Sequence, residues 1–223
     1  MKKNRDSEAV FVVEGEKMMR EILKNWSHYI VLFCTSNEEF RENNDAFFID
    51  KNTMKDLSAL RTPSDFLLVM RQPPLQSNTT NLTLAIDGIQ DPGNMGTIIR
   101  TADWFGVDEI VCSKETVDIF NSKVIQSSMG SLFRIPVRYL DLHNYLSDAS
   151  RPIYGALLEG GDIYEKKLHA KCIIVIGNEG NGISKSLCSL IDEPIFIPGK
   201  GAAESLNAAV ATGIVLSEFS RSN

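Results

Sequence analysis

Hydrophobic and polar residues alternate along the chain in two stretches of short strands and helices, which a polar segment separates. In the first stretch, apolar runs of three to five residues predict strands at Phe11–Val13, Tyr29–Phe33, Phe47–Ile49 and Phe66–Met70. Apolar residues at helical spacing predict one helix after Gly15 and a shorter one over residues 54–60. This alternation is typical of a small α/β unit with a mixed or partly parallel sheet.

The polar segment, Gln72–Asn81, reads QPPLQSNTTN and carries two prolines, no charge and little apolar content. These features indicate a linker rather than a folded element. We therefore predict a small α/β domain over residues 1–72, a linker over residues 73–81 and a second domain over residues 82–223.

The second stretch is a longer series of strands and helices. Apolar runs predict strands at residues 82–86, 107–112, 135–139, 153–158, 172–176 and 195–197. Helical spacing predicts helices after the loop DPGNMG at residues 91–96, over residues 118–129, over residues 141–148, and from about residues 204–205 to near the end. Strands that alternate with helices predict an α/β domain with a mostly parallel sheet.

Three of the predicted strands end in loops of small residues: Glu159-Gly160-Gly161, Gly177–Gly182 and the loop after Pro198. Ligands of open α/β sheets bind at the carboxyl ends of the strands, so we expect one shared pocket there. The loop GNEGNG at residues 177–182 lacks both the glycine order of a dinucleotide site and the lysine of a phosphate loop. A glycine-rich surface turn with an incidental Glu179 is the structural alternative.

Two helices carry residues with both a functional and a structural interpretation. Arg100 projects opposite the apolar stripe of its helix, so it is either a ligand-binding cation or an ordinary solvated arginine. Asn94 is by default a helix cap. In the terminal helix, the small residues at 208, 209, 211 and 213 would let another backbone approach closely, whereas Leu206 and Val210 are expected to make core contacts.

Composition limits the partners of the protein. The net charge of the 223 residues is −6, so any affinity for nucleic acid must come from a local group of cations. The four cysteines form no CxxC pair, which favours reduced thiols over disulfides or a metal site. No apolar run is long enough to span a bilayer, and the start MKKNRDSEAV lacks the apolar segment of a signal peptide. We therefore expect a cytoplasmic protein without a membrane segment or a metal ion.

Three ordered stretches carry a family resemblance. DPGNMGTIIRTADWFG, IGNEGNGIS and IPGKGAAESLNAAVATGI lie at residues 91–106, 176–184 and 197–214. Their content, order and spacing resemble those of the SpoU-type RNA 2′-O-ribose methyltransferases, a branch of the knotted SPOUT superfamily, over nearly all of residues 82–219. The front part, with FVVEG before a helix, resembles the small ribosomal-protein-like RNA-binding domain that precedes the catalytic domain in several of these enzymes.

The resemblance implies a sheet with helices on both faces, a C-terminal trefoil knot, and a bent S-adenosylmethionine held in the knot largely by backbone groups. The cofactor contacts that it implies are Leu157, Gly177, Ile197 and Leu206. The catalytic polar residues that it implies are Asn94, Arg100, Glu179, Ser205 and Asn207. No metal is required.

The implied reaction is the transfer of a methyl group to a ribose 2′-hydroxyl by a homodimer. A guanidinium group stays protonated, so Arg100 is expected to clamp a phosphate and the developing alkoxide rather than to act as a base. The two-domain plan favours ribosomal RNA as the substrate, and transfer RNA is the alternative. A non-catalytic RNA-binding protein of the same fold and a nucleotide-dependent oxidoreductase are the rival functions.

The chain departs from the family pattern in ways that concern the looseness of the loop after Pro198 and the contacts with RNA. Gly199 stands where methionine is frequent, and Gln126 stands where many relatives have an arginine. The extension before Phe11 is short. We expect the first domain to supply the cations for RNA, which are Lys2, Lys3, Arg5, Lys17, Arg20 and Lys24. The alternative RNA surface consists of Lys114, Lys123, Arg134 and Arg138.

Overall fold

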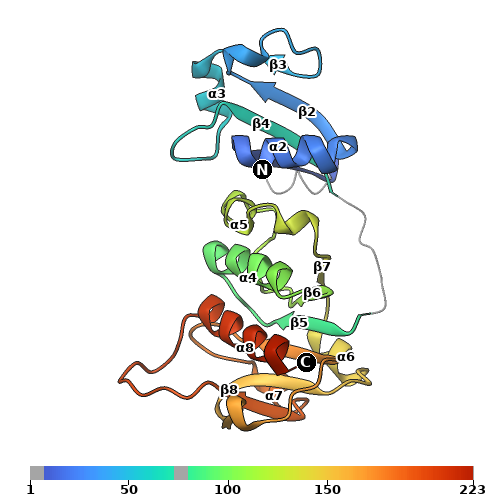
Figure 1. Cartoon of the computed structure of the whole chain (residues 1–223), viewed down its shortest axis with the longest axis vertical. Coiled ribbons are helices and arrows are strands. Elements are labelled where there is room, and N and C mark those ends of the chain that lie inside the picture. Colours follow the sequence, from blue (N-terminus) through green and yellow to red (C-terminus); the bar gives the residue numbers. More distant parts are fainter. Residues whose placement is uncertain (1–7, 73–79, 223) are drawn as a thin grey trace. The chain divides into compact units, whose positions relative to one another are not determined.

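The computed structural model describes residues 8–72 and 80–222, and the chain divides between residues 74 and 75 into two compact units (Figure 1). Of the predicted linker, residues 73–79 lie outside the described residues. The same holds for three of the cations proposed to contact RNA, Lys2, Lys3 and Arg5.

The first unit contains a four-stranded sheet in the order β1-β4-β2-β3. Its helices and strands are β1 (Val10–Glu14), α2 (Glu16–Asn25), β2 (Ile30–Thr35), β3 (Phe47–Phe48), α3 (Lys51–Leu57) and β4 (Phe66–Arg71). Strand β4 is antiparallel to β1 and β2, whereas β2 and β3 are parallel. The sheet is therefore mixed, as the alternation of strands and helices predicts.

The helices of the first unit follow the predicted pattern. Met18, Met19 and Ile22 of α2 are buried, because their spacing places them on one side of the helix. Helix α3 begins after Asp50, whose carboxylate accepts hydrogen bonds from two backbone amides of the first turn. It begins three residues earlier than the sequence pattern indicates.

The second unit contains a six-stranded sheet in the order β10-β8-β9-β5-β6-β7, and each described pair of neighbouring strands is parallel. Its strands are β5 (Leu82–Ile86), β6 (Glu109–Cys112), β7 (Val137–Tyr139), β8 (Ile153–Asp162), β9 (Cys172–Ile176) and β10 (Glu193–Phe196). Its helices are α4 (Pro92–Trp104), α5 (Ser122–Ser128), α6 (Leu142–Ser147), α7 (Lys185–Cys188) and α8 (Ala208–Ser222). The predicted parallel α/β architecture is confirmed.

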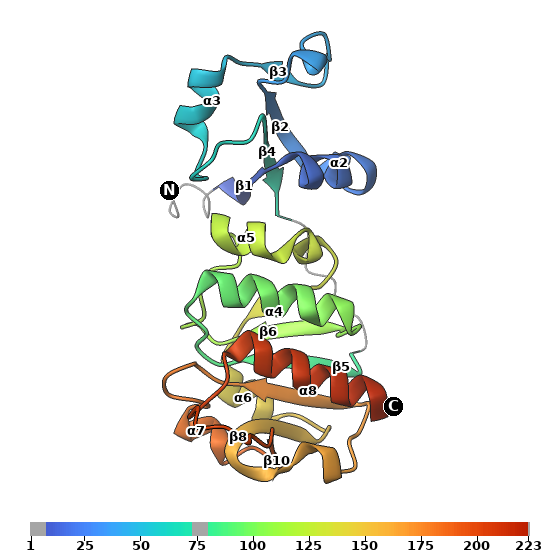
Figure 2. The ribbon, with the colours of Figure 1, turned by 60° about the vertical axis from the view of Figure 1, so that its left-hand side comes forward.

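Helices cover both faces of this sheet (Figure 2). Leu146 of α6 and Leu187 of α7 belong to a core cluster with Val175 of β9 on one face. Helices α4 and α8 cover the other face, and α5 packs beside α4. Gly96 lets α4 and α5 approach closely, since a Cβ atom at this position would lie 2.0 Å from Ser127 Oγ. The central strands β5, β6 and β9 are almost entirely buried.

The structure corrects several of the predicted boundaries in the second unit; for example, β10 is Glu193–Phe196 and not residues 195–197. Helix α4 begins at Pro92, inside the predicted loop, and α5 covers only the second half of the predicted helix at residues 118–129. Strand β8 continues through Gly160 and Gly161, because Gly161 pairs with Ile195 of β10. The predicted start of the last helix at residues 204–205 is wrong: α8 begins at Ala208.

Candidate active site

Three of the polar residues implied by the resemblance meet in one hydrogen-bonded cluster. Asn94 Nδ2 donates to Glu179 Oε1 at 2.7 Å, and Asn207 Nδ2 donates to Asn94 Oδ1 at 3.0 Å. Asn94 lies in the first turn of α4, Glu179 in the connection after β9, and Asn207 directly before α8. The cluster thus joins one residue from each of the three sequence stretches, and its central member is an uncharged amide.

The start of α4 is fixed by Asp91 and not by Asn94. Asp91 Oδ1 accepts a hydrogen bond from the backbone amide of Asn94 at 2.8 Å, so the interpretation of Asn94 as the helix cap is wrong. This hydrogen bond holds the pKa of Asp91 below its ordinary value, with a smaller contribution from Lys123, whose Nζ lies 3.5 Å from Asp91 Oδ2. The side chain of Asn94 is therefore free to bind Glu179 and Asn207.

The side chain of Asn207 binds both α8 and Asn94 of α4. Its Oδ1 accepts hydrogen bonds from the backbone amides of Ala209 at 2.9 Å and Val210 at 3.3 Å, which caps α8. Its Nδ2 is then directed to Asn94. The cap of the last helix and the polar cluster depend on the same side chain.

The connection after β9 is a closed turn. Asn178 and Gly182 exchange two backbone hydrogen bonds, and Asn178 Oδ1 accepts from the amides of Gly180 and Asn181. Gly177 has no room for a side chain, because a Cβ atom would lie 2.2 Å from the carbonyl carbon of Gly182. Glu179 is exposed on this turn. The alternative of an incidental glutamate is not favoured, since its carboxylate binds a residue 85 positions away.

The connections near β8 and β10 differ from the prediction. Leu157 lies within β8 and not at its end: Gly155 pairs with Pro194 and Gly161 with Ile195, so residues 156–160 bulge opposite a single peptide of β10. A Cβ atom at Gly160 would lie 2.5 Å from the backbone of Ile195, so only glycine permits this close approach. The bulge exposes 68% of Leu158.

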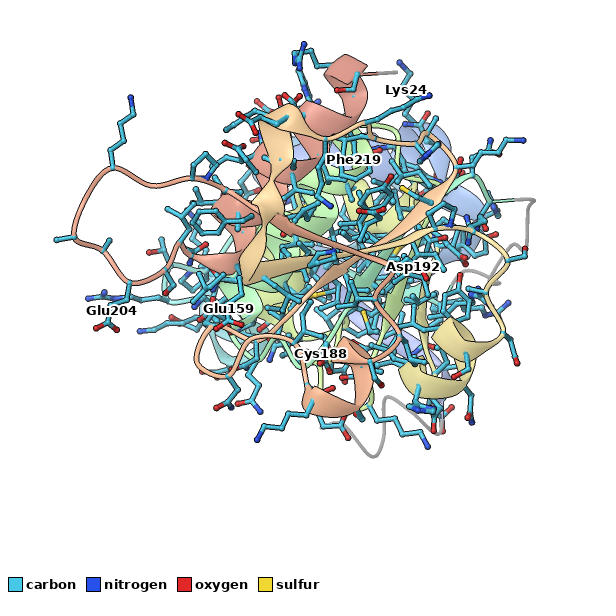
Figure 3. The ribbon with its side chains drawn as sticks, turned by 90° about the horizontal axis from the view of Figure 1, so that it is seen from below. Lys24, Glu159, Cys188, Asp192, Glu204 and Phe219 are labelled. Carbon is cyan, nitrogen blue, oxygen red and sulfur yellow. The ribbon has the colours of Figure 1, made fainter. Side chains whose placement is uncertain are left out.

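The loop between β10 and α8 projects from the body of the second unit, as the position of Glu204 shows (Figure 3). Ile197 is half-buried at its start, whereas Ser205 and Leu206 near its end are exposed. Among the described residues, the backbone groups from Pro198 to Leu206 make no hydrogen bond with another backbone group. Ser205 does not join the polar cluster, and the expectation that Leu206 is a core residue is wrong, since 46% of it is exposed.

Arg100 lies on the exposed side of α4, as the helical periodicity predicts. It makes no hydrogen bond or ion pair within the part of the chain that the structure describes. Six residues of the same helix, a rise of about 9 Å, separate it from Asn94. A cation that has no partner in the described part of the chain, on the helix that also carries Asn94, is suited to hold an anionic ligand.

Known proteins resemble the chain over its whole length. The family model of the SpoU rRNA methylases matches residues 81–217. The 23S rRNA (guanosine(2553)-2′-O)-methyltransferase RlmP of Bacillus subtilis is 34% identical over 96% of the chain and 90% of that protein. The chain belongs to the SpoU rRNA methylase family. As a member of this family it is an RNA methyltransferase, and the resemblance of residues 82–219 to the SpoU-type enzymes is confirmed. The resemblance of the first domain to a ribosomal-protein-like RNA-binding domain stays a prediction.

Solved structures support the same family. A putative RNA methyltransferase of the TrmH family from Porphyromonas gingivalis superposes with a TM-score of 0.86 at 35% identity, over 100% of the chain and 94% of that protein. An AdoMet-bound rRNA methyltransferase from Sinorhizobium meliloti superposes with a TM-score of 0.84 at 28% identity, over 99% of the chain and 90% of that protein. Both superpositions include the first unit of the SpoU chain as well as the second.

Other ionisable side chains of this SpoU protein are paired or buried within the fold. In the alternative RNA surface, Arg134 pairs with Asp103 at 2.7 Å and Arg138 pairs with Glu109 at 2.5 Å. Burial raises the pKa of the Cys112 thiol strongly and that of Cys172 to about 12, so neither is a nucleophile at neutral pH. The described residues contain no cluster of His, Cys, Asp or Glu that could hold a metal ion and no helix that could cross a membrane.

The sequence reasoning missed three residues that hold the site together. They are Asp87, Asp91 and Asn178. Asp87 Oδ2 accepts a hydrogen bond from the Ser184 amide at 2.7 Å, and Asn178 Nδ2 donates to the Gly88 carbonyl at 2.8 Å. Short polar side chains at the edges of glycine loops are the signal that could have identified them, because such residues bind nearby backbone groups.

Proposed function

We propose that this SpoU protein transfers a methyl group from S-adenosylmethionine to a ribose 2′-hydroxyl of ribosomal RNA. The observation that carries this proposal is the cluster of Asn94, Glu179 and Asn207, which unites the three family stretches at one edge of the sheet. The names of the B. subtilis and S. meliloti proteins support ribosomal RNA as the substrate. A ribosomal substrate also agrees with the predicted cytoplasmic location.

The residues at the proposed cofactor site have the chemistry that an adenosine group needs. Among the described residues, backbone donors and acceptors without a backbone partner follow β10, and exposed or half-exposed leucines lie on the β8 bulge and before α8. Backbone groups can bind the polar edge of an adenine ring, while leucine side chains contact its faces. On this basis Leu157, Gly177, Ile197 and Leu206 hold the cofactor, with Gly177 keeping the β9 turn narrow. When bound, the cofactor supplies a methyl group on a positively charged sulfur.

The polar cluster orients the sugar. Attack by the 2′-oxygen requires that oxygen, methyl carbon and sulfur be aligned, so positioning supplies most of the catalysis. Asn94 and Asn207 present amide groups to the ribose hydroxyls, and Glu179 fixes the orientation of the Asn94 amide. Ser205 contributes a hydroxyl group from the β10–α8 loop.

Arg100 binds charge on the RNA. Its guanidinium group remains protonated throughout, so it holds the phosphate next to the target ribose and stabilises negative charge that develops on the 2′-oxygen. The proton of the hydroxyl group passes to water or to that phosphate. Because Arg100 has no partner among the described residues, its charge need not be released from another contact first.

The protein acts as a homodimer through α4 and α8. Trp104 of α4 and Val210 of α8 are 84% and 52% exposed. Val210 lines a groove whose other apolar residues are Phe105, Tyr164 and Ile214. Such a set of apolar side chains is favourable to bury against a second copy. The small residues that suggested a dimer have another use, since Ala208 and Ala209 are buried within the subunit.

Purified protein incubated with S-adenosylmethionine labelled in its methyl group and with unmodified 23S rRNA tests this function. Digestion of the RNA to nucleosides should give label in a ribose-methylated nucleoside. Label in a base, or labelling of transfer RNA in preference to ribosomal RNA, would overturn the proposed position or substrate. Heat-denatured protein is the matched control.

A further inference from the structure

We propose that Asn178 is a positioning residue, which holds Glu179 in reach of Asn94 by fastening the connection after β9 to the connection after β5. This inference rests on the proposed function, because it assigns a role in the same site. In the described part of the chain, Asn178 makes no hydrogen bond with the three cluster side chains and acts through the backbone of Gly88.

Two contacts join the same pair of connections side by side. Asn178 Nδ2 donates to the Gly88 carbonyl at 2.8 Å, and the next residue, Glu179, accepts from Asn94 at 2.7 Å. Gly88 precedes α4 and Asn94 lies in its first turn. The first contact therefore sets how closely the glutamate approaches the helix that carries Asn94.

Gly88 also binds a third connection. Its amide donates to Ser113 Oγ at 3.1 Å and to Thr116 Oγ1 at 3.2 Å, both in the segment after β6. The connections at the carboxyl ends of the neighbouring strands β6, β5 and β9 thus meet at one residue, Gly88. Asn178 ties the β9 connection to a point that is already fixed from the other side.

The remaining polar atoms of Asn178 stiffen its own turn. Its Oδ1 accepts from the amides of Gly180 at 2.9 Å and Asn181 at 3.2 Å, while its backbone pairs with Gly182. Glu179 therefore lies between two fixed residues on a short closed turn. Asparagine suits this position because one side chain both donates and accepts, whereas aspartate would only accept.

The test replaces Asn178 with aspartate, which keeps the acceptor for the turn amides and removes the donor to Gly88. The matched control is Asn181→Asp, the same change in the same turn, at an exposed side chain without a hydrogen bond in the described part of the chain. Misplacement of the cluster by about 1 Å can reduce turnover by roughly a hundredfold. We expect Asn178→Asp to lower kcat by about that factor, and Asn181→Asp to leave it unchanged.

A double-mutant comparison separates this role from general destabilisation. If Asn178 acts through Glu179, then Asn178→Asp should reduce kcat no further in a Glu179→Gln protein. Reductions that multiply would contradict the proposal. Asn178→Ser, which keeps a short acceptor but cannot reach Gly88, should reproduce the aspartate variant and replaces it if the aspartate variant does not fold.

A readout without catalysis keeps this test independent of the proposed function. The side-chain amide signal of Asn94 in an NMR spectrum reports its hydrogen bond to Glu179. In folded Asn178→Asp protein this signal should move toward its position in Glu179→Gln, and in Asn181→Asp it should stay. An unmoved signal in Asn178→Asp would overturn the inference even in an active enzyme, and a wild-type protein without methyl transfer would instead refute only the proposed function.

Discussion

At the scale of single residues, the site is held together by hydrogen bonds between side chains that lie far apart in the chain. The hydrogen bond between Asn94 and Asn207 joins residues 113 positions apart in the sequence, and a local sequence pattern cannot predict a contact over such a separation. The exposed position of Arg100 was predictable, because helical periodicity alone decides it. The contacts of Asp87 and Asn178 were not, since each binds the backbone of a distant connection.

Replacement of Arg100 should separate catalysis from cofactor binding. Arg100→Ala removes a charge that acts on the RNA, so turnover should fall by about a hundredfold or more, as when a single oxyanion-stabilising donor is lost. Affinity for S-adenosylmethionine, measured by calorimetry, should stay at the wild-type value. Arg100→Lys keeps the positive charge but loses the planar guanidinium group with its paired N–H donors. Its turnover should therefore lie between that of the wild type and that of Arg100→Ala. Full turnover of Arg100→Ala would remove this residue from the mechanism.

Leu206→Asp should abolish cofactor binding, which Arg100→Ala should leave unchanged. Leu206 is 46% exposed, so the change leaves the core intact while it places a charge in the proposed adenosine site. Cofactor binding should be lost with little change in thermal unfolding. Binding at wild-type affinity would show that Leu206 does not contact the cofactor.

At the scale of elements, the buried strands were the most predictable part. Strand β9 is fully buried and apolar, and its observed bounds equal the predicted ones. Strand β8 was predicted too short, because Gly160 and Gly161 read as a turn although close packing against Ile195 requires glycine there. The start of α8 was misplaced, since the residues before Asn207 have ordinary helix propensity and only the cap decides the boundary.

The cap of α4 gives a prediction at this scale. Asp91→Ala removes the acceptor for the Asn94 amide and should lower the free energy of unfolding by about 1 kcal/mol. Asp91→Asn keeps an acceptor and loses only the exposed ion pair with Lys123, which contributes little. Urea denaturation of the two variants compares them, and equal losses would show that charge rather than capping is what stabilises the helix.

At the scale of the whole molecule, the two-part organisation suggests a division of labour. Helix α2 exposes Lys17, Arg20 and Lys24, although Arg20 also pairs with Glu16. We expect a fragment that begins at residue 80 to bind S-adenosylmethionine and to form dimers, with most of its RNA affinity lost. Residue 80 is the preferred start, because Arg151 binds the carbonyl groups of Thr80 and Asn81.

Filter binding over a series of salt concentrations measures this loss. Each phosphate contact that disappears should reduce the salt slope by about one unit. An unchanged slope would indicate that RNA binds to the second unit, where Lys114 and Lys123 are exposed. The trefoil knot expected from the resemblance stays a prediction at this scale.

The proposed dimer can be tested separately from activity. Trp104→Glu places a charge on the most exposed large apolar side chain of α4, so light scattering should show a monomer. Val31→Glu, a similar change at a half-exposed residue of the first unit, is the control and should leave the dimer intact. A wild-type monomer at micromolar concentration with full activity would contradict the dimer.

The most direct test of the central claim is a map of ribose methylation in the 23S rRNA of cells that lack this protein. We predict that one 2′-O-methyl group is missing, and that it returns when the wild-type chain is expressed but not when the Arg100→Ala chain is expressed at the same level. An unchanged methylation map, or full restoration by Arg100→Ala, would contradict the account.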